Sequence, residues 1–164
     1  MDINLLSKEY FTNGFISGIP IISEENSLHH RNELEKAESK IGNLHYKTKV
    51  HTILKSPFEL ATNKKILEIV EKIIGPNILL HNVTYIIKEP NTKTHVSWHQ
   101  DLTYWGFNND HQVSAWIALS PTTKRSGCMQ MIPKSHNIGK FKHVKTYDKN
   151  NVLSRGQTVL NVEK

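Results

Sequence analysis

The sequence has almost no cysteine and no long apolar run. Cys128 is the only cysteine among 164 residues, so no disulfide can form within the chain. No stretch approaches the ~20 apolar residues that a membrane-spanning helix requires. The first residues also lack the basic start and apolar run of a signal peptide. These absences argue against a disulfide-rich secreted module and a membrane-bound protein, and they favour a cytoplasmic one.

Acidic residues are also in short supply. Asp and Glu total 15 against 21 Lys and Arg, which gives a net charge of +6. The basic residues are scattered singly or in pairs, and no aromatic and basic platform accompanies them, so we do not expect a nucleic-acid partner. A basic surface also suits a small acidic substrate. The length and a mean hydropathy of −0.47 predict one soluble domain over residues 1–164.

The first part of the chain carries helix signals. Ser7 is placed to cap a helix over residues 8–13, with Gly14 at its end. Ser23 is placed to cap a second, polar helix that runs to about Lys40. The thin apolar stripe of this second helix predicts that it lies on the surface.

Two more helix signals follow. Ser56-Pro57-Phe58-Glu59 has the pattern of a capping box with proline at the first helical position. Residues 64–74 place their apolar side chains on one helical face, and Gly75-Pro76 predicts the end of that helix. Residues 1–75 are therefore predicted to form a helical N-terminal part.

After residue 76 the residue pattern becomes typical of β-strands. The later segments are rich in β-branched and aromatic residues, alternate between apolar and polar positions, or end at proline. We expect the remainder of the chain to hold the first strands of an antiparallel barrel or jelly roll, in a mostly β fold with N-terminal helices. The expected strands are 78–87, 96–101, 113–119, 127–132 and one within 152–162.

One motif points to metal chemistry. In Ser97-Trp98-His99-Gln100-Asp101, an extended chain would place the His99 imidazole and the Asp101 carboxylate on the same face. These are two of the three ligands of the facial triad that holds non-haem Fe(II) and leaves coordination positions open. The spacing alone is weak, because His-x-Asp also occurs by chance on surface loops.

The surrounding blocks resemble the phytanoyl-CoA dioxygenase family. The segment His95-Val-Ser-Trp-His-Gln-Asp-Leu-Thr-Tyr-Trp-Gly-Phe107 is similar to the iron-binding segment of that family. Ser114-Ala-Trp-Ile-Ala-Leu119 is similar to its next strand, and Gly127-Cys-Met-Gln-Met-Ile-Pro-Lys-Ser-His136 to its Gly-Cys…Pro-Gly-Ser-His block. Gly75-Pro-Asn77 and Ile86-Ile-Lys-Glu-Pro90 match in place and order. The similarity runs from about Leu54 to Gln157.

The resemblance implies a double-stranded β-helix, a cupin-like jelly roll, that uses Fe(II), 2-oxoglutarate and O2 to hydroxylate a C–H bond of a small organic substrate. Succinate and CO2 would be the co-products. His99 and Asp101 match the first two iron ligands of the family, and Trp116 and Gln100 match positions that line or support the 2-oxoglutarate pocket. Because the related halogenases carry a small residue where Asp101 stands, hydroxylation is favoured over halogenation.

The sequence departs from the family pattern after residue 136. The third ligand should be a histidine followed about ten residues later by an arginine that pairs with 2-oxoglutarate, and we find neither. His136 matches a turn block, and His143 has Arg155 as its nearest following arginine. The jelly roll is therefore expected to be incomplete and the chain to be part of a longer protein. The alternative reading is a catalytically inactive jelly-roll module that lacks the third iron ligand.

Overall fold

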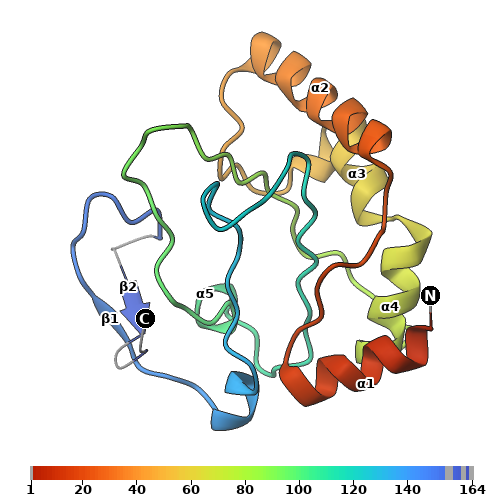
Figure 1. The fold of residues 1–164 in the computed structure, drawn as a ribbon, viewed down its shortest axis with the longest axis vertical. Helices are drawn as coiled ribbons and strands as arrows, with labels where there is room; N and C mark the ends of the chain where they lie inside the picture. The colour runs from red at the N-terminus through yellow and green to blue at the C-terminus, as the bar shows by residue number, and fades with distance from the viewer. Residues whose placement is uncertain (1, 154–156, 160–161, 163–164) are drawn as a thin grey trace.

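The computed structural model of the chain describes residues 2–153, 157–159 and 162. Figure 1 shows helices α1 to α4 along one side and a small sheet on the other, with long irregular segments between them. The helices are α1 Ile3–Asn13, α2 Glu24–Ile41, α3 Lys55–Ala61, α4 Lys64–Ile74 and α5 Leu102–Trp105, with 3-10 turns η1 Val50–Thr52 and η2 Ser135–Ile138. The strands are β1 His143–Lys145 and β2 Gln157–Val159. None of the helices in the described ranges is long and apolar enough to cross a bilayer.

Helix α1 begins earlier than its sequence signals indicate. Asp2, not Ser7, is its N-cap, because the Asp2 carboxylate accepts from the backbone N–H groups of Asn4 and Leu5 at 2.9 and 3.2 Å. An aspartate also suits the positive end of the helix dipole. The predicted end at Gly14 is confirmed: this residue is left-handed, with φ 83°, and its N–H caps the carbonyl of Tyr10.

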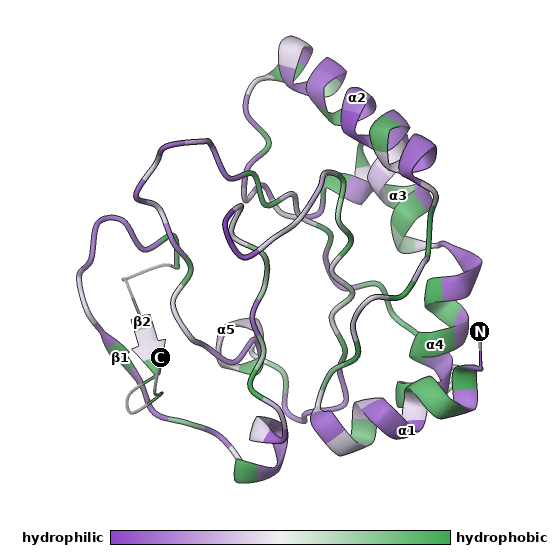
Figure 2. Ribbon diagram, in the orientation of Figure 1, coloured by the Kyte–Doolittle hydropathy of each residue, from purple (hydrophilic) through white to green (hydrophobic). Residues whose placement is uncertain are grey.

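Helix α2 follows its predicted course. The Ser23 hydroxyl accepts from the N–H of Asn26 at 3.1 Å, and Gly42 ends the helix after Ile41. Leu34 is its one buried residue. Its other residues are exposed or half-buried, which confirms that it lies on the surface, and Figure 2 shows the hydrophilic colour of most of them.

The predicted capping box at Ser56 is wrong. Helix α3 begins at Lys55 after the N-cap position Leu54, so Ser56 lies inside the helix and caps nothing. Ser56 is buried, and its hydroxyl lies 2.9 Å from Nδ1 of His30 on α2. The Ser56 hydroxyl is used for this contact between helices, which joins α2 to α3.

Helix α4 is confirmed within its predicted bounds. It buries Ile66 and Ile69 and packs against α1, and the Asn63 side chain caps it by accepting from Lys65 N at 3.0 Å. Gly75 ends it with φ 84°.

The predicted strands are mostly absent as regular strands. Residues 78–87, 96–101, 113–119 and 127–132 form no strand ladder, although His45–Tyr85 and His95–Asn151 make isolated parallel bridges. A strand needs a partner along its length as well as the right side chains, and these segments have no continuous partner among the described residues. Within 152–162, β2 lies at Gln157–Val159, while residues 154–156, including Arg155, and residues 160–161 fall outside the described ranges. The jelly roll stays a prediction.

The core lies where the helical part meets residues 83–87. Leu34, Leu44, Val50 and Tyr85 are buried together, and Leu119 packs against them. The backbone N–H of Tyr46 donates to Tyr85 O at 2.9 Å, and that of Val50 to Val83 O at 3.2 Å. This pairing ties residues 83–87 to the helical part of the chain. The remaining core neighbours are Ala37, Leu54, Val83 and Ile87.

Candidate metal centre

His99 and Asp101 face each other directly. The Nε2 atom of His99 lies 3.2 Å from Oδ1 of Asp101, and the two side chains are 25% and 43% exposed. The geometry is not that of a strand, because Asp101 has the helical φ and ψ of −53° and −42° and leads into α5. The predicted convergence of the two side chains is thus present, although a turn rather than a strand produces it.

The far atoms of both side chains are already engaged. His99 Nδ1 lies 2.9 Å from the carbonyl of Ser97, which can only accept, so Nδ1 carries the proton and Nε2 has the lone pair when the ring is neutral. The Ser114 hydroxyl donates to Asp101 Oδ2 at 2.7 Å. His99 Nε2 and Asp101 Oδ1 are therefore left pointing at the same position. The hydrogen bonds at the opposite atoms of the two side chains, His99 Nδ1 and Asp101 Oδ2, fix this orientation.

Each side chain favours the charged form of the other. Burial alone would lower the pKa of His99, but its hydrogen bonds with Asp101 and Ser97 and the Asp101 charge outweigh burial, so the pKa lies above its ordinary value. Burial would raise the pKa of Asp101, but hydrogen bonds with His99 and Ser114 and the His99 charge hold it below its ordinary value. Since Asp101 remains part exposed, water weakens the pairing.

The spacing of the pair suits a divalent ion. Two adjacent ligands of an octahedral ion, each about 2.1 Å from the metal, lie about 3.0 Å apart. The observed 3.2 Å between His99 Nε2 and Asp101 Oδ1 needs little adjustment to match that value. Among the residues that the structure describes, no group of three His, Cys, Asp or Glu side chains gathers in a metal-binding arrangement.

The segment 95–101 is held at several positions by residues 139–152 and by Val159. His95 N donates to Asn150 O and Val152 N to His95 O, both at 2.9 Å. Near the ligands, Val159 N donates to Trp98 O at 3.0 Å. The Asn151 amide donates to Ser97 Oγ at 2.8 Å. These contacts fix the backbone that carries both candidate ligands.

Gln100 lies between the two candidate ligands and binds the same later segment. Its side-chain NH2 donates to Gly139 O at 2.9 Å, and its side-chain oxygen accepts from Phe141 N at 2.8 Å. Its backbone N–H donates to His143 Nε2 at 2.9 Å. The observed contacts of Gln100 are therefore structural, and its role at a 2-oxoglutarate pocket stays a prediction.

Neither weighed candidate for a third ligand joins the pair. His143 Nε2 accepts from Gln100, and its Nδ1 lies 3.1 Å from the carbonyl of Phe141, so both ring nitrogens are used. His136, in η2, packs against the C-terminal end of α1, where its Nε2 is 3.1 Å from Phe11 O. Its ring also packs so closely on Gly14 that a Cβ there would lie 2.4 Å from Nδ1.

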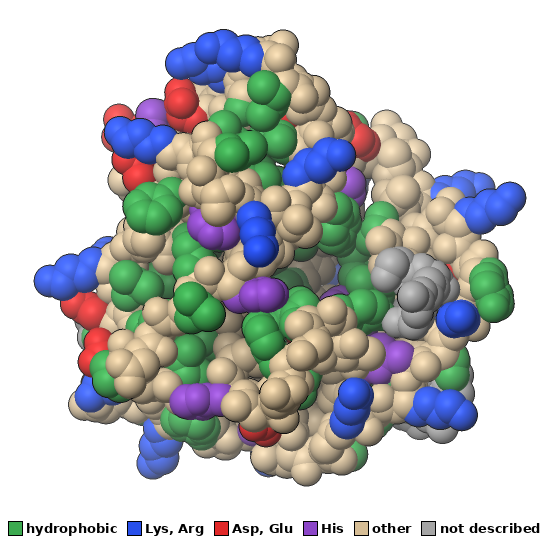
Figure 3. Space-filling model, turned by 180° about the vertical axis from the view of Figure 1, so that it is seen from behind, with side chains coloured by type: hydrophobic (Ala, Val, Ile, Leu, Met, Phe, Trp, Pro, Cys, Tyr) green, Lys and Arg blue, Asp and Glu red, His purple; other side chains and the backbone are tan. Residues whose placement is uncertain are grey.

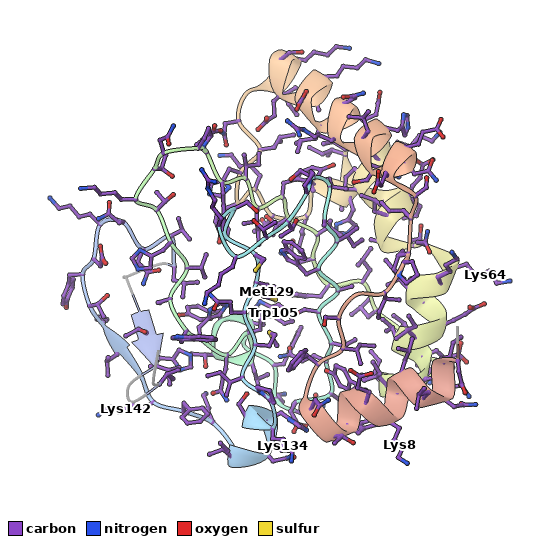
Figure 4. The ribbon with its side chains drawn as sticks, viewed as in Figure 1. Lys8, Lys64, Trp105, Met129, Lys134 and Lys142 are labelled. Atoms are coloured by element: carbon purple, nitrogen blue, oxygen red, sulfur yellow. The ribbon has the colours of Figure 1, made fainter. Side chains whose placement is uncertain are left out.

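Aromatic side chains border the centre. The ring of Tyr104 meets those of His99 and His143 edge to face at 5.8 and 6.0 Å. Trp105 and Phe107 form a ring cluster with His81, in which the centroids of His81 and Phe107 are 4.7 Å apart. Figure 4 places Trp105 and Met129 in the middle of the view, and Figure 3 shows apolar side chains and histidines around a hollow on the opposite face.

The predicted pocket residue Trp116 is 42% exposed, and its role at a 2-oxoglutarate pocket stays a prediction. Sequence reasoning missed Ser114 and Tyr104 as parts of this centre. Ser114 lies thirteen residues after Asp101, and its contact depends on the path of the intervening loop. The only available signal was its place at the start of the Ser114–Leu119 block.

Comparisons with known proteins agree with the resemblance. The family model "Phytanoyl-CoA dioxygenase (PhyH)" matches residues 17–160. A protein named probable alpha-ketoglutarate-dependent hypophosphite dioxygenase, from Stutzerimonas stutzeri, is 33% identical over 93 residues, which is 57% of this chain and 30% of that protein. The peroxisomal phytanoyl-CoA dioxygenase of Bos taurus is 32% identical over 127 residues, or 62% of this chain and 37% of that protein.

The chain thus spans about a third of the length of these relatives. The human peroxisomal phytanoyl-CoA dioxygenase is 35% identical over 86 residues, which is 50% of this chain and 25% of that protein. No solved structure matches the chain. Because the family match covers most of the sequence and includes His99 and Asp101, the chain belongs to the phytanoyl-CoA dioxygenase family.

Proposed function

We propose that this chain contributes two iron ligands to a 2-oxoglutarate-dependent dioxygenase that hydroxylates a small organic substrate. The observation that carries the proposal is the 3.2 Å approach of His99 Nε2 to Asp101 Oδ1, with the far atom of each side chain already bound elsewhere. Bound Fe(II), with O2 and 2-oxoglutarate, supplies the oxidation of a C–H bond, with succinate and CO2 as co-products.

In this proposal, neighbouring residues orient the two side chains that would bind the ion. The Ser97 carbonyl holds the proton of His99 on Nδ1, so that Nε2 offers its lone pair to the ion. Ser114 holds one oxygen of Asp101 and thereby favours coordination through the other. Trp116, which is 42% exposed, is assigned to the 2-oxoglutarate pocket by the family resemblance alone. Gln100 supports the centre by holding Gly139 and Phe141 in place.

The names of the relatives support a reaction class rather than a substrate. One relative is named for hypophosphite and others for phytanoyl-CoA, which are chemically unlike. The shared part of the names is the dioxygenase reaction. We therefore propose the reaction class and leave the substrate identity to experiment.

Metal and cosubstrate binding test the proposal. Anaerobic titration of the chain with Fe(II) and 2-oxoglutarate should give a visible charge-transfer absorption that saturates at one ion per chain. His99→Ala and Asp101→Ala should abolish it, because each removes a ligand. His111→Ala and Asp110→Ala remove exposed side chains of the same types outside the centre and should leave it unchanged. Saturation that survives both ligand variants would refute the assignment.

A second candidate function is metal binding without catalysis. The observation that favours it is the lack of a third metal-ligating side chain beside the pair among the described residues. In that case the chain would bind Fe(II) through His99 and Asp101 but release no labelled CO2 from 2-oxoglutarate in air. Release that depends on both residues would instead establish the dioxygenase.

A further inference from the structure

The two peptide groups that flank His99 both bind one rung of the small sheet, that is, one pair of partner residues in the β1–β2 ladder. On one side of His99, the backbone N–H of Val159 on β2 donates to the carbonyl of Trp98 at 3.0 Å. On the other side, the backbone N–H of Gln100 donates to Nε2 of His143 on β1 at 2.9 Å. His143 and Val159 are direct partners in the antiparallel register. A single rung therefore holds the chain on both sides of the first candidate ligand.

The imidazole of His143 accepts this hydrogen bond in only one tautomer. Its Nδ1 atom lies 3.1 Å from the carbonyl of Phe141, which can only accept, so Nδ1 carries the proton. Nε2 is left with its lone pair, to which the N–H of Gln100 donates. His99 has the same arrangement, since its Nδ1 faces the carbonyl of Ser97 two residues earlier. The two rings thus share a tautomer and differ in task, because His99 Nε2 faces the position of the ion and His143 Nε2 faces a peptide group.

Helix α5 holds the ring of His143 from another direction. Tyr104 contacts the rings of His99 and His143 edge to face, with centroids 5.8 and 6.0 Å away and interplanar angles of 78° and 88°. The hydroxyl oxygen of Thr103 lies 3.4 Å from His143 Nδ1. Figure 1 shows α5 beside the small sheet, in agreement with these contacts. The position of the His143 ring relative to residues 98–101 is therefore fixed by its own strand and by α5.

The hydrogen bond from Gln100 lies at the bend that brings the two candidate ligands together. Asp101 has helical φ and ψ of −53° and −42°, so the chain turns directly after Gln100. The peptide between His99 and Gln100 joins the first ligand to this turn, and its N–H is the group that His143 accepts. A half-buried N–H that loses its acceptor no longer favours one orientation of its peptide. The 3.2 Å separation of His99 Nε2 and Asp101 Oδ1 would then be held less firmly.

We propose that His143 is a positioning residue of the candidate metal centre. It does not bind the ion; it accepts the N–H of Gln100 and so fixes the peptide between the two ligands. The inference rests on the proposed function, because it gives His143 a task relative to the ion that His99 and Asp101 would bind. A histidine that served only to attach β1 would change the stability of the chain and leave the affinity and geometry of the bound ion unchanged.

NMR of the metal-free chain tests the hydrogen bond itself. The amide nitrogen of Gln100 and Nε2 of His143 should show a scalar coupling across the bond. The nitrogen spectrum of the His143 ring should show a protonated Nδ1 and an unprotonated Nε2. A protonated Nε2 would overturn the proposal. This readout needs no ion, so it is separate from the test of the dioxygenase.

Titration of the chain with Co(II), whose visible absorption reports its coordination geometry, tests the effect on the ion. His143→Phe keeps a ring and removes the acceptor, so it should weaken Co(II) binding about tenfold and change the absorption spectrum. His143→Gln restores an acceptor near the position of Nε2 and should recover most of the affinity and the native spectrum. Val144→Ala is the matched control: it weakens the neighbouring rung, where Val144 pairs with Thr158, and should lower stability to urea without changing Co(II) binding.

Three outcomes of this titration would overturn the proposal. They are a His143→Phe variant that binds Co(II) like wild type, equal losses in His143→Phe and His143→Gln, and a Val144→Ala variant that loses as much affinity as His143→Phe. A wild-type chain that binds no Co(II) would refute the proposed metal centre and this inference with it. Binding by wild type that is lost in His99→Ala but unchanged in His143→Phe would refute this inference alone.

Discussion

At the scale of single residues, the Ser114 hydroxyl orients the carboxylate of Asp101. Its 2.7 Å hydrogen bond to Oδ2 leaves Oδ1 toward His99. We expect Ser114→Ala to weaken metal affinity about tenfold, as removing such supporting hydrogen bonds commonly does. Titration with Fe(II) measures this, and Ser39→Ala on α2 is the control. Unchanged affinity would mean that Ser114 does not orient the carboxylate.

Gln100 provides a second prediction at this scale. Its side chain makes two hydrogen bonds to the backbone of Gly139 and Phe141, so Gln100→Ala should lower the free energy of unfolding by about 1–3 kcal/mol. Urea denaturation measures the loss, with exposed Gln130→Ala as the matched control. If Gln100 instead contacts 2-oxoglutarate directly, the variant would lose cosubstrate affinity while its stability stayed near that of wild type.

The approach of His99 to Asp101 could be predicted from the sequence because the two residues lie two positions apart. His99 and Asp101 need only a local bend to meet, and the flanking blocks mark the family. The residues that hydrogen-bond to this segment from elsewhere in the chain could not be predicted from local spacing. Ser114, Gly139 and Phe141 reach the pair through loops whose path depends on packing elsewhere. Nothing in their own sequence positions specifies those contacts.

At the scale of elements, the junction of α1 and η2 depends on the lack of a side chain at Gly14. A Cβ there would lie 2.4 Å from Nδ1 of His136, and φ is 83°. Gly14→Ala should cost more than the roughly 1–2 kcal/mol of a left-handed alanine alone. Gly106→Ala is the matched control, since Gly106 is also left-handed, with φ 68° and open space around it.

A double variant separates the two causes. With His136→Ala in the background the clash disappears, and Gly14→Ala should then cost about as much as Gly106→Ala, roughly 1–2 kcal/mol. Urea unfolding of the four proteins in the cycle gives the coupling energy. A coupling near zero would show that the ring of His136 does not press on Gly14.

Helices were more predictable from sequence than strands for a physical reason. Gly14, Ser23 and Gly75 act through hydrogen bonds and dihedral angles within one turn, so their signals are local. The capping box predicted at Ser56 was wrong because this residue lies inside α3 and its hydroxyl contacts His30 on another helix, a non-local contact. The strand-like segments satisfy a side-chain pattern, but pairing is non-local, and only β1 and β2 form a ladder in the described ranges.

At the scale of the whole molecule, histidines whose pKa values shift in opposite directions contribute to the dependence of stability on pH. Burial lowers the pKa of His30 and His45 from 6.5, more than neighbouring carboxylates raise it. Their stabilisation is fully present above pH 6.5 and is lost as pH falls through their folded pKa values. His99, whose pKa is raised, stabilises below pH 6.5 and loses its contribution as pH rises through its folded pKa.

A variant of His45 tests directly the predicted loss of stability at acid pH. Its Nδ1 accepts from Ile87 N at 2.8 Å, which requires an unprotonated nitrogen, while Glu38 and Glu89 partly favour its charge. In metal-free protein, His45→Gln should reduce the loss of stability below pH 6.5. Unfolding by urea across pH 5–8, with His111→Gln as the exposed control, measures the change. An unchanged acid slope would show that another group governs it.

The hydrogen bonds that residues 139–152 and Val159 make to residues 95–101 form late during synthesis of the chain. While the nascent chain leaves the ribosome, Asp101 emerges well before Val159, whose N–H holds the backbone of Trp98. At ordinary synthesis rates the delay over these ~60 residues is about 3–12 seconds. During that interval the backbone that carries the two candidate ligands lacks these later hydrogen bonds, although the local contact between His99 and Asp101 needs only residues already made. Under the proposed function, iron would then meet a fully held centre only after residues 139–152 and Val159 have been made.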